Sequence, residues 1–120
     1  MPNKTKKLRG RAASAGQVLG PVRVIRNDAD LPNIQPGDIV IADQTEPSMG
    51  PHLRKAGAIV TAKGGRTCHA AIYSRERGIP CVLGIEDAPA LLGKFKFAVV
   101  NGGEGIVCMS QESKDLEDQS

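Results

Sequence analysis

Short apolar runs interrupted by glycine and proline limit the fold of this chain more than any other feature of its sequence. The runs read DIVIA, AGAIVT, CVLG, FKFAVV and GIVCM, at residues 38–42, 56–61, 81–84, 95–100 and 105–109. Apolar runs of this length between turn residues are typical of buried β-strands. The turn NGGEG, which separates the last two runs, predicts that they form a hairpin.

A longer strand is predicted over VLGPVRVIR, at residues 18–26, where every second residue from Val18 lies on one half-buried face. Pro21 cannot donate a hydrogen bond to a neighbouring strand. We therefore expect Pro21 at a sheet edge or beside a bulge.

Two main helices are predicted between the strands. The first covers residues 46–56, with Ser48 as a possible N-cap and Pro51 in the first turn, where its missing N–H does no harm. The second begins near Thr67 and ends before Gly78, which fits the left-handed position that closes many helices. Strands that alternate with helices in one part of the chain and form hairpins in another predict an α/β fold with a mixed sheet.

The chain has 120 residues, which is the length of a single domain. We expect residues 8–109 to form that domain. Residues 1–7 and 110–120 are polar and lack apolar periodicity, so we expect a disordered basic tail and a disordered acidic tail.

The net charge of +3 arises at the ends of the chain. Residues 1–11 carry five Lys or Arg, and residues 111–120 carry a net charge of −3, which leaves +1 for the middle. Aromatic residues, on which bases would stack, make up only 2% of the chain. This distribution does not favour a nucleic-acid partner.

The cysteines Cys68, Cys81 and Cys108 are odd in number and far apart, without a C-x-x-C pair. This pattern favours reduced thiols in a cytoplasmic protein. No apolar run approaches the roughly 18 residues that span a bilayer, and no apolar segment follows the charged MPNKTKK, so we expect neither a membrane partner nor a secretory signal. The close, repeated ligand spacing of a metal site is missing as well, so no metal is expected.

The run GGRTCHAAI places one of the two histidines at the start of the second predicted helix. The first turn of a helix offers free N–H groups and about half a unit of positive charge. Gly64 and Gly65 can adopt the backbone angles that let an anion approach. Arg66 adds a forked donor suited to phosphate, and Thr67 could cap the helix.

His69 follows in the first turn, beside this predicted anion site. The positive helix end favours a neutral imidazole, which is a competent nucleophile toward phosphorus. We predict that His69 carries phosphate and that the four residues before Cys68 bind it. From spacing alone, the alternative that His69 is an ordinary surface or hydrogen-bonding histidine stays open.

Other candidate residues have simpler interpretations. Cys68 could form a thiol–imidazole dyad with His69, but adjacent helix residues point about 100° apart, which favours Cys68 as a small packed hydrophobe. The other two cysteines are predicted core residues. Asp43 and Glu46 could be an acid–base pair, but carboxylates in loops more often form turns or caps. His52, beside two basic residues, is predicted on a solvated face.

The stretch AGAIVTAKGGRTCHAAIYSRERGIPCVLG, at residues 56–84, closely resembles the phosphohistidine, or swivelling, domain of phosphoenolpyruvate-utilising enzymes. That family includes phosphoenolpyruvate synthase, pyruvate phosphate dikinase and Enzyme I of the sugar phosphotransferase system. The cysteine before the histidine is most similar to phosphoenolpyruvate synthase. GRAASAGQVLGPVRVI and NGGEGIVCM resemble the opening segment and the closing hairpin of the family, so the resemblance spans roughly residues 8–109.

The resemblance implies a swivelling β/β/α domain in which His69 matches the phosphoacceptor. Thr67 matches the threonine that a regulatory kinase or phosphorylase modifies. The implied partners are an ATP-grasp nucleotide-binding domain and a pyruvate- or phosphoenolpyruvate-binding barrel domain, in the same or a separate chain. ATP and Mg would be used by those domains, and no cofactor is expected on this one. The chain would then be a phosphotransferase component that is not active alone.

Departures from the family pattern leave a second hypothesis open. Tyr73 and Ser74 replace an apolar residue and an alanine that are common after the motif, Arg77 replaces a leucine, and Asn101 replaces an aspartate. The first three raise questions about packing and docking faces more than about chemistry. The alternative is a stand-alone regulatory or binding module that keeps the fold without cycling phosphate.

Overall fold

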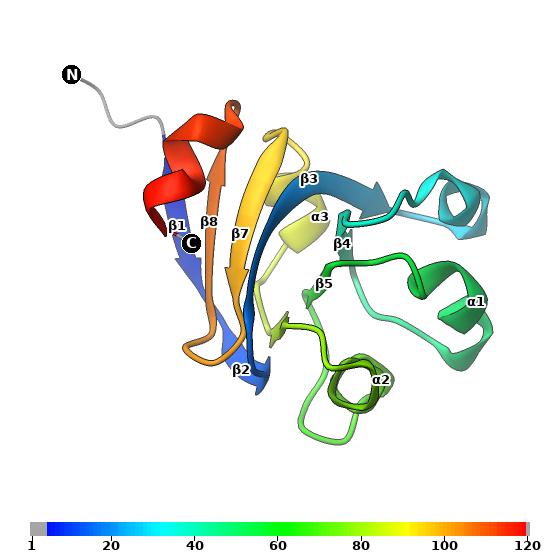
Figure 1. Ribbon diagram of the computed structural model, residues 1–120. Coiled ribbons are helices and arrows are strands. Elements are labelled where there is room, and N and C mark those ends of the chain that lie inside the picture. The colour runs from blue at the N-terminus through cyan, green and yellow to red at the C-terminus, as the bar shows by residue number, and fades with distance from the viewer. Residues whose placement is uncertain (1–4, 120) are drawn as a thin grey trace.

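A computed structural model describes residues 5–119, with the side chains of Asp118 and Gln119 left out (Figure 1). In this part of the chain eight strands form one mixed sheet in the order β1-β8-β7-β3-β4-β5-β6-β2. The strands are β1 (Lys6–Arg9), β2 (Arg11–Ser14), β3 (Gln17–Ile25), β4 (Ile39–Ala42), β5 (Ala58–Thr61), β6 (Cys81–Leu83), β7 (Phe97–Asn101) and β8 (Ile106–Ser110). The neighbours from β3 to β6 run parallel, and the other pairs are antiparallel.

The sheet is folded back on itself at two places. β1 and β2 lie at opposite ends of the strand order although only Gly10 separates them in sequence. A Cβ atom at Gly10 would lie 2.3 Å from the carbonyl oxygen of Leu83, so only glycine fits this crossing. β3 makes the second crossing, because its first half pairs with β7 and its second half with β4.

β3 is an interior strand without a bulge at Pro21, but Pro21 itself pairs with a neighbouring strand on one side only, which fits its missing N–H. It is the last β3 residue paired with β7, and the pairing with β4 begins at Val22. Each half of β3 has one neighbour, so an interior strand accommodates a residue without an N–H at the point where the partner changes.

The helical segments are η1 (Asp28–Asn33), η2 (Pro47–Met49), α1 (Gly50–Leu53), α2 (His69–Arg77), α3 (Ala88–Leu92) and η3 (Ser113–Gln119). The first predicted helix, 46–56, is much shorter than expected. It consists of the 3-10 turn η2 and the four-residue α1, and Glu46 rather than Ser48 occupies the N-cap position of η2. Pro51 cannot donate the hydrogen bond that would join the two turns into one helix. No helix in residues 5–119 is long and apolar enough to cross a membrane.

The second predicted helix is confirmed, with a later start. α2 begins at His69, two residues after Thr67, and ends at Gly78, whose left-handed φ of 71° closes it as expected. α1 and α2 lie on the opposite side of β4 and β5 from β7 and β8 (Figure 1).

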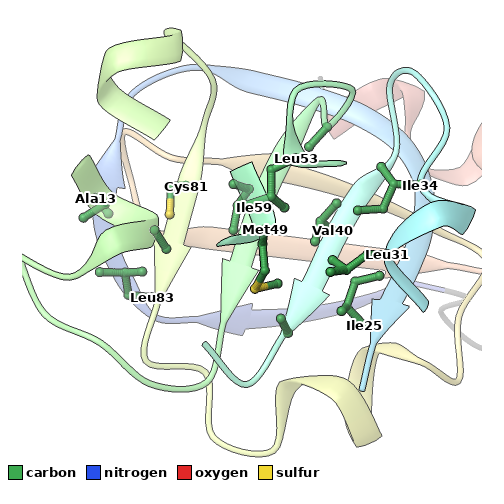
Figure 2. Close-up of a cluster of buried hydrophobic side chains, with 14 residues drawn as sticks. Ala13, Ile25, Leu31, Ile34, Val40, Met49, Leu53, Ile59, Cys81 and Leu83 are labelled. Atoms are coloured by element: carbon green, nitrogen blue, oxygen red, sulfur yellow. The ribbon is translucent and has the colours of Figure 1, made fainter. Parts of the chain in front are cut away.

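Two cores separate the molecule into three layers. Between the helices and the parallel strands, one core joins Val40 of β4 and Ile59 of β5 to Met49 and Leu53, as Figure 2 shows. Between the two halves of the sheet, a second core joins residues of β4, β5 and β6 to residues of β7 and β8, and α3 contributes Ala88 and Leu92. Helices, parallel strands and antiparallel strands thus form a β/β/α arrangement, and the predicted α/β fold with a mixed sheet is confirmed.

The predicted disordered tails are wrong where the structure describes them. Lys6 and Lys7 belong to β1 and pair with β8, while residues 1–4 lie outside the described range. At the other end, η3 packs on the outer face of the antiparallel strands and buries Leu116 completely against Val99 and Cys108. One leucine in a polar segment gives no periodic pattern, yet it is enough to dock the segment on an apolar surface.

Candidate functional site

The loops that follow β4 and β5 meet at one end of the sheet. These strands are parallel neighbours, with Ala42 opposite Thr61, so the segments after them leave the sheet side by side. The loop after β4 carries Thr45, and the loop after β5 leads into His69 at the start of α2. The carboxyl ends of parallel strands are a common place for ligand sites in α/β proteins.

A side-chain hydrogen bond holds His69 in this place. Nδ1 of the imidazole lies 2.8 Å from Oγ1 of Thr45. Thr45 is buried, with only 7% of its surface exposed, whereas His69 is half-buried. A hydroxyl can donate or accept, and a neutral imidazole has one donor and one acceptor nitrogen. If Nδ1 donates to Thr45, Nε2 keeps a free lone pair and can act as the nucleophile.

Thr45 is a site residue that sequence reasoning missed. It lies 24 positions before His69, in the loop where Asp43 and Glu46 had been weighed as an acid–base pair. A threonine in a loop has no pattern of its own, and only the parallel register of β4 and β5 brings it to the histidine. The family resemblance, which spans roughly residues 8–109, was the one sequence signal that included this loop.

Gly64 and Gly65 form the turn that leads into α2. Gly64 has a φ of 120°, a conformation that glycine adopts readily, and a Cβ atom there would lie 2.7 Å from Sγ of Cys68. The carbonyl of Gly65 accepts a hydrogen bond from the N–H of Cys68 at 3.0 Å. Within α2, the N–H of Ile72 donates to the carbonyl of Cys68. The N–H groups of residues 69–71 precede this bond, so they belong to the first turn of the helix, whose N–H groups have no partner within the helix.

Arg66 and Thr67 both have exposed side chains. The predicted capping role of Thr67 is wrong, because α2 begins later and Cys68, with extended backbone angles, takes the N-cap position without a capping side-chain bond. The predicted phosphate-binding residues thus form one short loop before His69. Their binding of phosphate stays a prediction.

A second residue without a signal in the sequence, Arg75, fixes this loop. Its Nη1 donates to the backbone carbonyl of Arg66 at 2.9 Å, and its Nε donates to the carbonyl of Ala13 in β2 at 2.8 Å. One guanidinium therefore ties the loop before His69 to the edge of the sheet.

The other candidate residues have structural roles. Cys68 packs partly buried against the helix-side core, as a small hydrophobe would, and Cys81 and Cys108 are buried in strands. Burial raises the pKa of the Cys81 thiol to about 11 and also raises the pKa of Cys108, so both stay protonated and unreactive near neutral pH.

The two loop carboxylates have separate roles in the structure. Asp43 forms an ion pair with Lys63 at 3.0 Å, and Glu46 occupies the N-cap position of η2. His52, in α1, is half-buried and not on the fully solvated face that we expected. Nothing here favours an acid–base pair.

Comparison with known proteins is consistent with this fold. The sequence model of "PEP-utilising enzyme, mobile domain" matches residues 34–105, and the chain belongs to that family. It is 44% identical to phosphoenolpyruvate synthase of Pseudomonas aeruginosa over 96 residues, and 45% identical over 96 residues to that of Escherichia coli. Each alignment covers 80% of this chain and 12% of the relative, so the chain spans about an eighth of the length of these proteins.

A solved structure shares the architecture. The solution structure of an Enzyme I protein superposes with a TM-score of 0.58 at 31% identity, over 73% of this chain and 36% of the other. These three relatives are thus larger proteins, in which the corresponding segment is one part of a longer chain.

Proposed function

We propose that this chain is a mobile phosphocarrier that accepts a phosphoryl group on Nε2 of His69 and passes it to an acceptor site elsewhere. The observation that supports this most directly is the 2.8 Å contact between Nδ1 of His69 and the buried hydroxyl of Thr45, at the start of α2. It orients the ring and assigns the two nitrogens different tasks.

In the proposed transfer, His69 and Thr45 are the two residues that act on the acceptor side. The lone pair of Nε2 forms a bond to phosphorus as the bond between phosphorus and the leaving oxygen of the donor breaks. The ring is then positively charged, and it loses the proton on Nδ1 to the surrounding water, since His69 is only half-buried. The Thr45 hydroxyl, which accepted from Nδ1 before transfer, can donate to the bare Nδ1 afterwards, so the bond persists in both states.

The loop before His69 suits the charge that the ring acquires. A phosphorylated imidazole would carry anionic oxygens at the start of α2, where the positive helix end, the loop of Gly64 and Gly65 and the exposed side chain of Arg66 could stabilise them. Thr67 is the proposed regulatory position. Its exposed hydroxyl is accessible to a kinase, and a phosphate two residues from His69 would repel an incoming phosphoryl group.

The partners follow from the family. We propose a nucleotide-binding domain of the ATP-grasp type as one partner and a barrel domain that binds pyruvate or phosphoenolpyruvate as the other. ATP and Mg would act on those domains, and this chain would supply only the carrier residue. It would then be a component of a phosphotransferase and would turn over only with its partners.

The test is to label the full chain with a nucleotide-binding domain taken from a phosphoenolpyruvate synthase and ATP labelled in its phosphates. We expect a label that is lost in acid and survives alkali, as a phosphoramidate does, and that is absent from His69→Ala but present in His52→Ala. A label that His69→Ala retains would refute the assignment. A fully folded chain that takes up no label would favour the alternative of a regulatory or binding module.

A further inference from the structure

The aromatic ring of Tyr73 lies against the imidazole of His69. The ring centroids are 5.5 Å apart and the planes are tilted by 32°. This separation lies within the roughly 4.5–7 Å range of interacting aromatic pairs. Tyr73 follows His69 by four positions, so the two side chains share one face of α2. The residue that departs from the family pattern thus contacts the proposed nucleophile directly.

Tyr73 is itself held at both ends. Its ring packs partly buried against the helix-side core. Its hydroxyl donates to the carbonyl of Gly50, the first residue of α1, at 3.2 Å. A Cβ atom at Gly50 would lie 4.0 Å from the tyrosine ring, an ordinary contact distance, so Gly50 lies directly beside the ring. Because both ends of the Tyr73 side chain are held, its ring presents a fixed surface to His69.

A single hydrogen bond does not fix a histidine ring. The bond to Thr45 sets where Nδ1 lies, but the terminal torsion of histidine is broad, so the ring can still tilt about that contact. The contact with Tyr73 comes from a different direction and a different residue. Together the two contacts define the plane of the imidazole and therefore the direction of Nε2.

We propose that Tyr73 is a positioning residue for His69, holding the imidazole so that Nε2 faces an incoming phosphoryl group. This inference rests on the proposed phosphocarrier function. The effect on the ring does not depend on that function, because Tyr73 limits the motion of the His69 ring whether or not phosphate is transferred. A transferred group must meet the nucleophile with the reacting atoms in line, so a freely tilting ring would react more slowly.

The test uses the full chain and phosphoramidate, a small phosphoryl donor that needs no partner protein. The P–N bond of phosphoramidate breaks, phosphorus bonds to Nε2, and the departing ammonia takes up the proton that the ring loses from Nδ1. Tyr73→Leu removes the aromatic ring and keeps an apolar side chain. Tyr73→Phe keeps the ring and removes only its bond to Gly50. Leu116→Ala is the control, because it removes a buried side chain from the opposite face of the molecule.

We expect the phosphorylation rate to fall about tenfold in Tyr73→Leu and about two- to threefold in Tyr73→Phe, and to stay unchanged in Leu116→Ala despite its lower melting temperature. Carbon relaxation of the His69 ring, measured without any donor, should show a clear increase in ring mobility in Tyr73→Leu, a smaller increase in Tyr73→Phe and none in Leu116→Ala. A loss of stability would not produce this pattern. Wild-type rate and wild-type ring relaxation in Tyr73→Leu would overturn the proposal.

The experiment also distinguishes a failure of the phosphocarrier function from a failure of the positioning role of Tyr73. If the wild-type chain takes no phosphate from phosphoramidate, the result counts against the phosphocarrier function. Ring relaxation then decides on Tyr73 by itself, and unchanged mobility in Tyr73→Leu overturns the positioning role. If Tyr73→Leu does not fold, Tyr73→Phe decides, and a wild-type rate with wild-type ring relaxation in that variant overturns it.

Discussion

Replacing Thr45 with valine tests whether the bond to Nδ1 orients the nucleophile. Valine keeps the shape of threonine and exchanges the hydroxyl for a methyl group at a position that is 7% exposed, so the core around it should remain filled. The bond to Nδ1, 2.8 Å long in the native protein, is lost. A typical hydrogen bond contributes about 1 kcal/mol net, and a polar group left without a partner costs about 1–3 kcal/mol.

The kinetic effect should exceed the effect on stability. Because His69 is half-buried, water can replace part of the lost bond in the ground state, but water does not fix the ring. If about 1–2 kcal/mol of transition-state stabilisation is lost, phosphorylation of His69 slows by about five- to thirtyfold. Thr45→Ser retains the hydroxyl and should recover most of the rate.

The assay is the initial rate of acid-labile label on each variant, with melting curves measured in parallel. The free energy of unfolding should fall by about 1 kcal/mol, the net contribution of one hydrogen bond, because water can replace part of the lost bond. Equal rates for wild type and Thr45→Val would refute the reasoning, because the ring would then need no partner on Nδ1. Equal losses in Thr45→Ser and Thr45→Val would show that packing, not the hydroxyl, matters.

Three other predictions follow from the structure. Thr67→Asp should block phosphorylation of His69 by like-charge repulsion and should leave the melting temperature unchanged, because residue 67 is exposed. The uncharged Thr67→Asn should be labelled normally. Labelling of both variants at the wild-type rate would contradict this prediction. Leu116→Ala should lower the free energy of unfolding by about 2–5 kcal/mol and release the amides of residues 113–119 to hydrogen exchange, and retained protection would show that η3 docks by other contacts. The pKa of Cys81, raised from 9.0 to about 11 by burial, means that its thiol binds a proton more tightly in the folded chain. The stability it contributes is complete below about pH 9 and is lost as the pH rises through 11, so urea denaturation over this range should show a steeper loss in wild type than in Cys81→Ala.

Much of the secondary structure could be predicted because its causes are local. The apolar runs that became β4 to β8 were bounded by turn residues, and Gly78 ended α2 as its left-handed φ of 71° requires. The length of the first predicted helix was wrong because local signals competed there. Pro51 was compatible with a helix start, but its missing N–H divided the segment into η2 and α1.

The sequence by itself determined the short-range chemistry of this protein. The glycine pair, the arginine and the histidine are neighbours in the chain, so the start of α2 and the loop before it would lie together in almost any fold. The tertiary structure alone decided what completes the site. Thr45 reaches His69 from 24 positions away because β4 and β5 are parallel neighbours, and Tyr73 is anchored because α1 packs beside α2. Likewise, the strands on either side of Gly10 are separated to opposite ends of the sheet, and Leu116 is buried on a surface formed by β7 and β8. These contacts depend on strand register and on burial between distant segments, which no local pattern of residues encodes.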